Sequence, residues 1–204
     1  MPAVEPNLDG RLGWLLDTPA HRPSLERGPD DPTERDAEPA GLRALQPPAG
    51  LPSAFHRFID DPQLRRHIRS ATACYLDLGH FRVGVKGGGT LIHFLSDQQW
   101  VLHWLLYVGP TGEEAVVASP EPLGFDDGET EHVLELDPDS WHGSLAVCGD
   151  SFEQFLYHFW AMNELFFRLA VDSTSVDGLP DDLRAYARAY PRTPSREDLF
   201  ADDD

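Results

Sequence analysis

The sequence predicts an α+β domain in which a central antiparallel sheet is flanked by N-terminal and C-terminal helices. Apolar and aromatic runs of strand length are concentrated in the middle of the chain, between residues 74 and 148. Most segments that join these runs are of hairpin length, which makes antiparallel pairing the expected arrangement. Segments with helical spacing of apolar residues lie on either side, at 52–68 and 152–189. We therefore expect one packed domain over residues 50–190.

The first part of the chain, residues 1–49, is rich in Pro, Asp, Glu and Arg and poor in β-branched and aromatic residues. Such a segment buries too little apolar area to offset its chain entropy, so it is predicted to be a disordered arm. It contains one apolar island, residues 12–16, which either folds back onto the domain or serves as a docking peptide for a partner. Folding back is favoured, because isolated apolar clusters usually join the core of their own protein.

Two short helices are predicted at the start of the domain. Pro52 suits the first position of a helix, and three apolar side chains then share one face: Phe55, Phe58 and Ile59. A second helix begins at Asp61-Pro62 and places Leu64 and Ile68 one turn apart.

Strands are predicted at 74–78 and 81–85, followed by a flexible turn at Gly87–Gly89. The strongest pair covers residues 90–95 and 101–108, joined by a polar turn. Neither member of this pair alternates with polar residues, which indicates burial on both faces in the middle of the sheet. Shorter strands are predicted at 115–119, 133–136 and 145–148.

The clearest helix runs from Phe152 to about Ala170. Ser151 and Gln154 have the spacing of a capping box at its start, and a broad apolar face follows, formed by Phe152, Phe155, Leu156, Phe159, Trp160, Leu165 and Phe166. A last helix is predicted over residues 180–189, and residues 191–204 are predicted to form an acidic flexible tail.

The charge balance restricts the class of partner. Sixteen basic residues face 35 acidic ones, for a formal net charge of −19. Such a surface repels nucleic acid and anionic lipid and attracts cationic proteins. The chain has no apolar run long enough for a membrane span and no secretory signal, so a cytoplasmic location is expected. Its two cysteines, Cys74 and Cys148, are too few for a disulfide framework or a thiolate zinc site.

The acidic residues are least balanced by basic ones in one long stretch of the chain. Between Lys86 and Arg168 the chain has no Lys or Arg, and it carries fourteen acids: Asp97, Glu113, Glu114, Glu121, Asp126, Asp127, Glu129, Glu131, Glu135, Asp137, Asp139, Asp150, Glu153 and Glu164. Folded into one sheet with its loops, these residues predict a continuous negative face that suits a basic target. General solubility in an acidic protein explains the same pattern equally well.

Catalytic and metal-binding patterns are weak. His93 and His103 are predicted to face each other across adjacent strands, within reach of one metal. No third ligand follows at a fixed offset, so the favoured interpretation is two partly buried histidines bonded to the backbone or to a neighbouring hydroxyl. The carboxylates at 126–131 lack the order of an EF-hand, and Gly87–Gly89 lacks the order of a P-loop. We expect no enzyme activity, no metal and no cofactor.

Several segments resemble the SUKH (Smi1/Knr4-like) superfamily. The run from Leu91 to Trp104 is similar to the family's central hairpin, and 114–117 is similar to the strand that follows it. Residues 151–156, Ser-Phe-Glu-Gln-Phe-Leu, resemble the start of the C-terminal helix, and residues 51–55 resemble the opening Leu-Pro helix. The resemblance implies an antiparallel sheet flanked by helices, no catalytic residues, and a role as an immunity protein or binding scaffold.

The sequence thus predicts a non-catalytic protein-binding module, most readily an immunity protein that neutralises a basic, nuclease-type toxin by direct binding. It is expected to act as a monomer or weak homodimer, without nucleic-acid or membrane partners. The predicted partner contacts are Asp97, Gln98, Gln99, Glu121, Asp126, Asp127, Glu129, Glu131, Asp137, Asp139 and Trp141. Two alternatives remain: a regulatory scaffold that recruits partners through the N-terminal arm, and a small hydrolase with an unrecognised carboxylate site.

Overall fold

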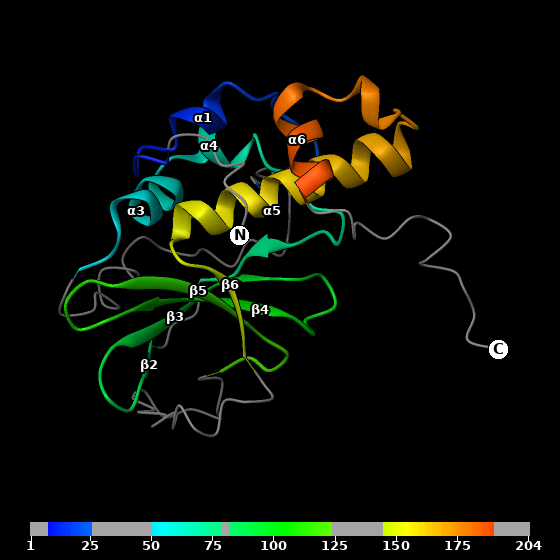
Figure 1. The fold of residues 1–204 in the computed structure, drawn as a ribbon. Helices are drawn as coiled ribbons and strands as arrows, with labels where there is room; N and C mark the ends of the chain where they lie inside the picture. The colour runs from blue at the N-terminus through cyan, green and yellow to red at the C-terminus, as the bar shows by residue number, and fades with distance from the viewer. Residues whose placement is uncertain (1–7, 26–49, 79–81, 124–144, 190–204) are drawn as a thin grey trace.

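A computed structural model of the chain describes residues 8–25, 50–78, 82–123 and 145–189. In it a layer of helices covers one face of an antiparallel sheet (Figure 1). This arrangement confirms the predicted α+β class. The predicted strand at 133–136 and the predicted tail at 191–204 lie outside the described residues.

The sheet has six strands, with the order β1-β3-β4-β5-β6 and with β2 as a second partner of β3. The strands are β1 (Tyr75–Leu76), β2 (Arg82–Gly84), β3 (Thr90–Ser96), β4 (His103–Val108), β5 (Glu114–Ser119) and β6 (Ala146–Gly149). Every residue of β3 is buried, and so is all of β4 except Tyr107. The missing alternation in these two segments therefore predicted their central position correctly.

The helices are α1 (Gly13–Leu16), α3 (Ser53–Asp60), α4 (Pro62–Arg65), α5 (Phe152–Phe166) and α6 (Asp181–Ala189). A π-helical turn, Phe167–Val171, continues α5, so its predicted extent is confirmed. Ser151 caps α5, because its Oγ accepts a hydrogen bond from the Gln154 N–H at 3.1 Å.

The main core lies between the helical layer and one face of the sheet. Phe94 of β3 is at its centre, with ring centroids 5.8 Å from Phe55 of α3, 5.5 Å from Phe152 and 5.7 Å from Phe155 of α5. A smaller apolar cluster covers the opposite face and consists of Val83, Leu91, Leu105 and Val117. The middle strands are thus apolar on both sides because each side has its own cluster.

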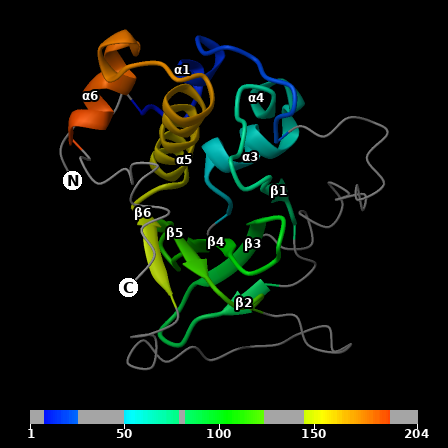
Figure 2. The same ribbon diagram turned by 90° about the vertical axis from the view of Figure 1, so that its right-hand side faces the viewer.

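The prediction that residues 1–49 form one disordered arm is wrong for residues 8–25. This segment crosses the helical layer on the side away from the sheet (Figure 2), and Leu12, Leu15 and Leu25 are buried in the main core. The apolar island therefore folds back onto the domain, as the favoured interpretation had it. Composition averaged over the whole arm concealed the three leucines that fix it. Residues 26–49 lie outside the described part of the chain.

The junction between β6 and α5 requires a glycine. A Cβ at Gly149 would lie 2.9 Å from the backbone nitrogen of Phe155 and 3.1 Å from its Cα. We expect Gly149→Ala to lower the free energy of unfolding by about 1–3 kcal/mol, since a helix backbone in a packed core cannot move aside. Urea denaturation measures the loss. Gly13→Ala is the control, because a Cβ there meets nothing within 4 Å; equal midpoints for both variants would contradict the prediction.

Candidate functional site

The tip of the β3–β4 hairpin, residues 97–102, exposes three consecutive apolar side chains. Trp100 is 41% exposed, Val101 57% and Leu102 36%. Gln98 and Gln99, both predicted partner contacts, are exposed immediately before them. Tryptophan is among the residues most enriched in protein-binding hot spots, and Val101 and Leu102 extend the exposed apolar surface beside it.

Asp97 organises this tip from within. Its Oδ1 accepts hydrogen bonds from the N–H groups of Val101 at 2.8 Å and Leu102 at 3.0 Å, and its own N–H donates to the Leu102 carbonyl. The residue is only 8% exposed. Asp97 therefore does not offer the free surface carboxylate that its predicted role as a partner contact required; it is a turn-stabilising residue.

Trp100 is held in a strained position. Its φ of 59° is in the left-handed region, which costs a bulky L-residue roughly 1–2 kcal/mol. The indole Nε1–H donates to Asp77 Oδ2 at 3.2 Å, and the Trp100 carbonyl lies 3.2 Å from His103 Nε2. The His103 ring also meets the indole edge to face, with centroids 5.2 Å apart. These contacts fix the exposed indole before any partner arrives, which reduces the entropy cost of binding.

A buried polar cluster lies beneath the tip, with Ser96 as its hub. Ser96 Oγ is 2.8 Å from Asp77 Oδ2, 2.9 Å from His93 Nε2 and 2.9 Å from His103 Nδ1. Ser96 pairs with His103 across the hairpin, and an irregularity between His93 and Leu95 turns His93 toward the same side. Asp77 directly follows β1, so the cluster joins residues of β3 and β4 to the segment after β1.

The two histidines face each other as the hairpin predicted, with ring centroids 5.2 Å apart. Their partners are the Ser96 hydroxyl and the Trp100 carbonyl, which matches the favoured interpretation of buried, bonded histidines. Within the described ranges, no three His, Cys, Asp or Glu side chains are grouped to hold a metal ion. Burial lowers the pKa of His93, opposed by Asp77, and it likewise lowers the pKa of His103.

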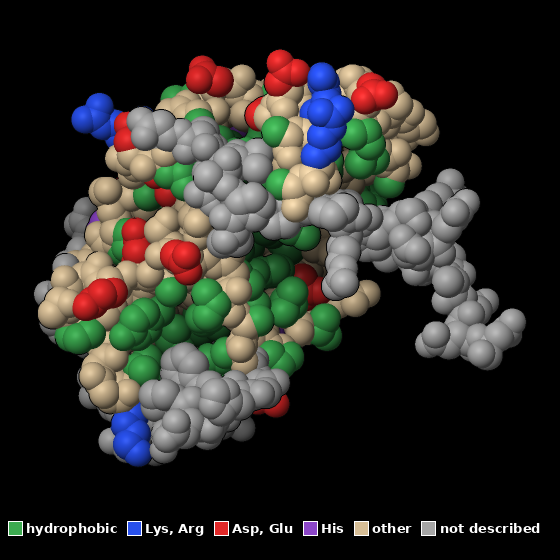
Figure 3. Space-filling view, viewed as in Figure 1, with side chains coloured by type: hydrophobic (Ala, Val, Ile, Leu, Met, Phe, Trp, Pro, Cys, Tyr) green, Lys and Arg blue, Asp and Glu red, His purple; other side chains and the backbone are tan. Residues whose placement is uncertain are grey.

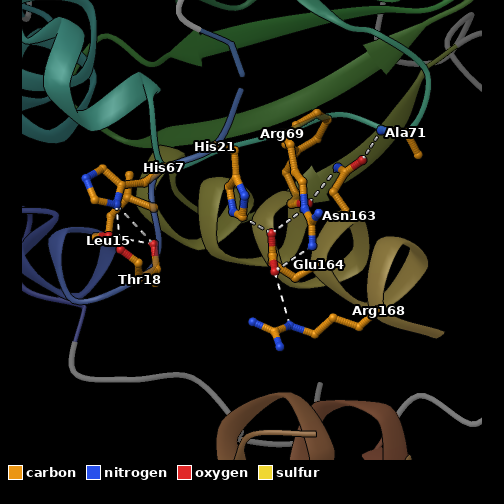
Figure 4. Close-up of polar contacts among 10 residues, drawn as sticks. Leu15, Thr18, His21, His67, Arg69, Ala71, Asn163, Glu164 and Arg168 are labelled. Carbon is orange, nitrogen blue, oxygen red and sulfur yellow. Dashed lines mark hydrogen bonds and ion pairs between the residues drawn. The ribbon is translucent and has the colours of Figure 1, made fainter. Parts of the chain in front are cut away.

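Glu164, one of the fourteen acids in the gap, belongs to the interior. It is 1% exposed, and Figure 4 shows it among three side chains from different segments. Arg69 binds both of its oxygens, at 2.8 and 3.1 Å, Arg168 Nε lies at 3.3 Å and His21 Nε2 at 2.9 Å. The two arginines stand on either side of the base-free stretch, so they neutralise an acid that was expected on the surface.

Glu153 is also an interior carboxylate. It accepts hydrogen bonds from the N–H groups of Gly10 at 2.6 Å and Leu12 at 3.2 Å, and from Trp14 Nε1 at 3.1 Å. Glu114 is half-buried and accepts from the Phe152 N–H at 3.2 Å. Burial raises the pKa of Glu114, with the Phe152 N–H acting against it.

The continuous negative face is therefore not formed by the acids that the structure describes. Four of them have structural roles, and three are exposed: Glu113, Glu121 and Asp150. On the face in Figure 3, carboxylates lie apart from one another and not as a band over the sheet. The other predicted contacts lie outside the described residues: Asp126, Asp127, Glu129, Glu131, Asp137, Asp139 and Trp141.

Glu121 lies at the same end of the sheet as the hairpin tip. Ser119, the last residue of β5, pairs with His103 at the start of β4. The Ser119 hydroxyl donates to the Glu121 carbonyl at 2.7 Å. Gln98, Gln99 and Glu121 are thus the predicted contacts that this end of the sheet carries on exposed positions. Sequence reasoning missed the apolar residues of the tip as partner contacts. It placed Val101 and Leu102 inside a buried strand, and it placed Trp100 in the turn without a binding role.

In comparisons with known proteins, no family model, no curated protein and no solved structure gives a significant match to this chain. None of the helices in the described part of the chain is long and apolar enough to cross a membrane.

Proposed function

We propose that this chain is a non-catalytic protein-binding module whose contact surface is centred on the β3–β4 hairpin tip. The observation that carries the proposal is Trp100, a partly exposed indole held at positive φ by Asp77 and His103. Strain of this kind persists where the surrounding structure determines it, and it is concentrated at functional positions. Gln98 and Gln99 would provide the polar rim around the apolar anchor.

The partner we propose is a basic toxin domain of nuclease type, which the chain would neutralise in the cytoplasm as a SUKH-like immunity protein. The net charge of −19 favours encounter with a cationic surface, and Glu121 lies at the end of the sheet that carries the tip. The resemblance of residues 91–104 to the SUKH hairpin covers the same tip. The protein would bind as a monomer or weak homodimer.

The two alternatives have less support. A scaffold that recruits partners through residues 12–16 would have to release Leu12 and Leu15 from the core, where both are buried. A hydrolase with paired carboxylates needs the two groups within about 10 Å of each other. Burial, and after it Glu153, raises the pKa of Glu114, so these two carboxylates are near each other. Both are already bonded to backbone donors: Glu114 to the Phe152 N–H, and Glu153 to those of Gly10 and Leu12. Glu164 is about three turns, or roughly 16 Å, from Glu153 along α5.

Trp100→Ala tests the tip directly. We expect the affinity for the toxin domain to fall about 30-fold, which corresponds to about 2 kcal/mol for a central aromatic anchor. Isothermal titration with a catalytically inactive, basic toxin domain of nuclease type measures it. Val147→Ala is the matched control, because Val147 is an exposed apolar residue on β6. Equal affinity of both variants would remove the tip from the interface.

The salt dependence of binding tests whether the partner is basic. Binding should weaken as salt rises, since attraction between exposed charges is screened beyond about 10 Å at 0.1 M ionic strength. A complex that is indifferent to salt would contradict a basic partner. No complex at any salt concentration would contradict the toxin assignment.

A further inference from the structure

When both histidines are neutral, the hydrogen-bond network beneath the tip has one hydrogen fewer than it has contacts. Four contacts must each contain a hydrogen: Ser96 with Asp77, Ser96 with His93, Ser96 with His103, and His103 with the Trp100 carbonyl. An ionised Asp77 and two neutral histidines leave three hydrogens for them, one on the serine hydroxyl and one on each ring. The choice of tautomers moves these hydrogens but does not increase their number.

A single additional proton on His103 completes the network. Nδ1–H then donates to Ser96, and Nε2–H donates to the Trp100 carbonyl. Ser96 is free to donate to Asp77, and His93 Nε2–H donates to Ser96. Without that proton, one of three contacts must be lost. The Trp100 carbonyl faces an unprotonated ring nitrogen, or Asp77 loses the Ser96 donor, or no hydrogen lies between Ser96 Oγ and His103 Nδ1. Each case weakens the hold on Asp77 or His103, the two residues that bind Trp100.

We infer that one proton, bound by the Asp77–His93–Ser96–His103 cluster, locks Trp100 in its exposed position and so regulates the binding surface at the hairpin tip. The regulatory meaning of this lock rests on the proposed function. Asp77 and His103 are positioning residues, because they act on a partner only through Trp100: Asp77 holds the indole N–H and His103 holds the carbonyl.

The charged and titratable groups around His103 determine where the proton is bound. Burial lowers the pKa of His103, while the Trp100 carbonyl, Asp77 and Asp97 favour the imidazolium. Burial also lowers the pKa of His93, Asp77 opposes this, and the His103 ring adds to the lowering. The thiol of Cys74, whose pKa burial raises, also lies near Asp97 and is neutral in this range. Because burial lowers the pKa of both histidines, the cluster binds the additional proton at a pH below about 6.5, the ordinary pKa of an imidazole.

Protonation of the cluster has opposite effects on the two properties: it fixes the position of Trp100 but lowers the stability of the whole fold. A histidine whose pKa is lowered by folding binds its proton first in the unfolded chain, so stability falls as the pH drops below about 6.5. The protein therefore becomes less stable overall in the same window in which the tip becomes more rigid. A titration must be followed within the folded range, which circular dichroism defines.

Nuclear magnetic resonance of the full chain tests the lock without a partner. We expect the imidazole nitrogens of His103 and the indole N–H of Trp100 to titrate together with one midpoint below pH 6.5. His103→Gln should abolish the shift of the Trp100 signal. His56→Gln, which alters a histidine of α3 far from the cluster in sequence, should leave it unchanged. If His103→Gln does not fold, the nitrogen shifts of wild-type His103 still report its protonation.

A binding series separates this inference from the proposed function. For the same toxin domain, the dissociation constant should rise by up to about tenfold per pH unit above the midpoint, and this slope should vanish in His103→Gln. A Trp100 signal that stays flat while the protein is folded would overturn the lock, even where the toxin domain binds. Coupled titration without any toxin binding would support the lock and refute only the proposed partner.

Discussion

Glu164→Ala is expected to lower the free energy of unfolding by about 3–5 kcal/mol, the cost of removing one partner from a buried ionic group. Arg69 would lose two hydrogen bonds while its guanidinium remains partly buried above the Phe167 ring, 4.2 Å from the centroid. His21 and Arg168 would lose the same carboxylate. The substitution also cuts the connection among three segments that are distant in sequence (Figure 4).

Chemical denaturation measures this loss, and the chain contains a matched surface pair. Asp177 and Arg188 lie 3.7 Å apart with both side chains largely exposed, and Asp177→Ala should cost about 0–1 kcal/mol. Glu164→Gln keeps the shape and two polar atoms but removes the charge, so we expect a value between these two. A Glu164→Ala variant as stable as Asp177→Ala would show that the buried cluster contributes nothing net.

The sheet and α5 could be predicted because their signals are local. The apolar runs at β3 and β4 are too continuous for a one-sided strand, and two separate clusters cover their two faces. Ser151 and Gln154 specify a helix start through a hydrogen bond that spans three residues. Both predictions can be made without knowing which residues pack against β3, β4 or α5.

The acids could not be assigned from the sequence because their environment is set by contacts between distant segments. Glu153 bonds to Gly10, and Glu164 to Arg69, across separations that no spacing rule covers. A count of formal charges treats both as surface groups, and it led to the expected negative face. Asp97 was misjudged for a different reason: it is a turn residue in a polar sequence, and its role depends on the exact geometry of the turn.

The hairpin tip was located correctly but its character was not. A turn near Gln98 was expected, and the two histidines meet as that turn requires. The strand was expected to resume at Val101, whereas β4 begins at His103. Because the strand begins two residues later than expected, Val101 and Leu102 lie in the exposed turn and not in the core. Trp100, with its positive φ, is part of this longer turn.

Leu15→Ala and Leu16→Ala are neighbours in α1 with opposite expected outcomes. Leu15 is fully buried in the core, while Leu16 is 46% exposed. We expect Leu15→Ala to destabilise the protein by about 2–5 kcal/mol through lost burial and the cavity left behind, and Leu16→Ala to cost less than about 1 kcal/mol. Thermal and urea denaturation of the two variants measure the difference.

This pair also decides how the N-terminal segment contributes to function. If residues 12–16 were a docking peptide held away from the domain, both substitutions would leave stability unchanged and both would weaken partner binding. If the segment is structural, Leu15→Ala should lower stability, and Leu16→Ala should change neither stability nor partner binding. Removing the whole segment cannot distinguish these cases, because it would uncover Tyr157 and Trp160, which contact Trp14, and leave Glu153 buried without its donors. Such a truncation would lose partner binding simply by unfolding, so the point substitutions are the test that separates a scaffold from a stabilised fold.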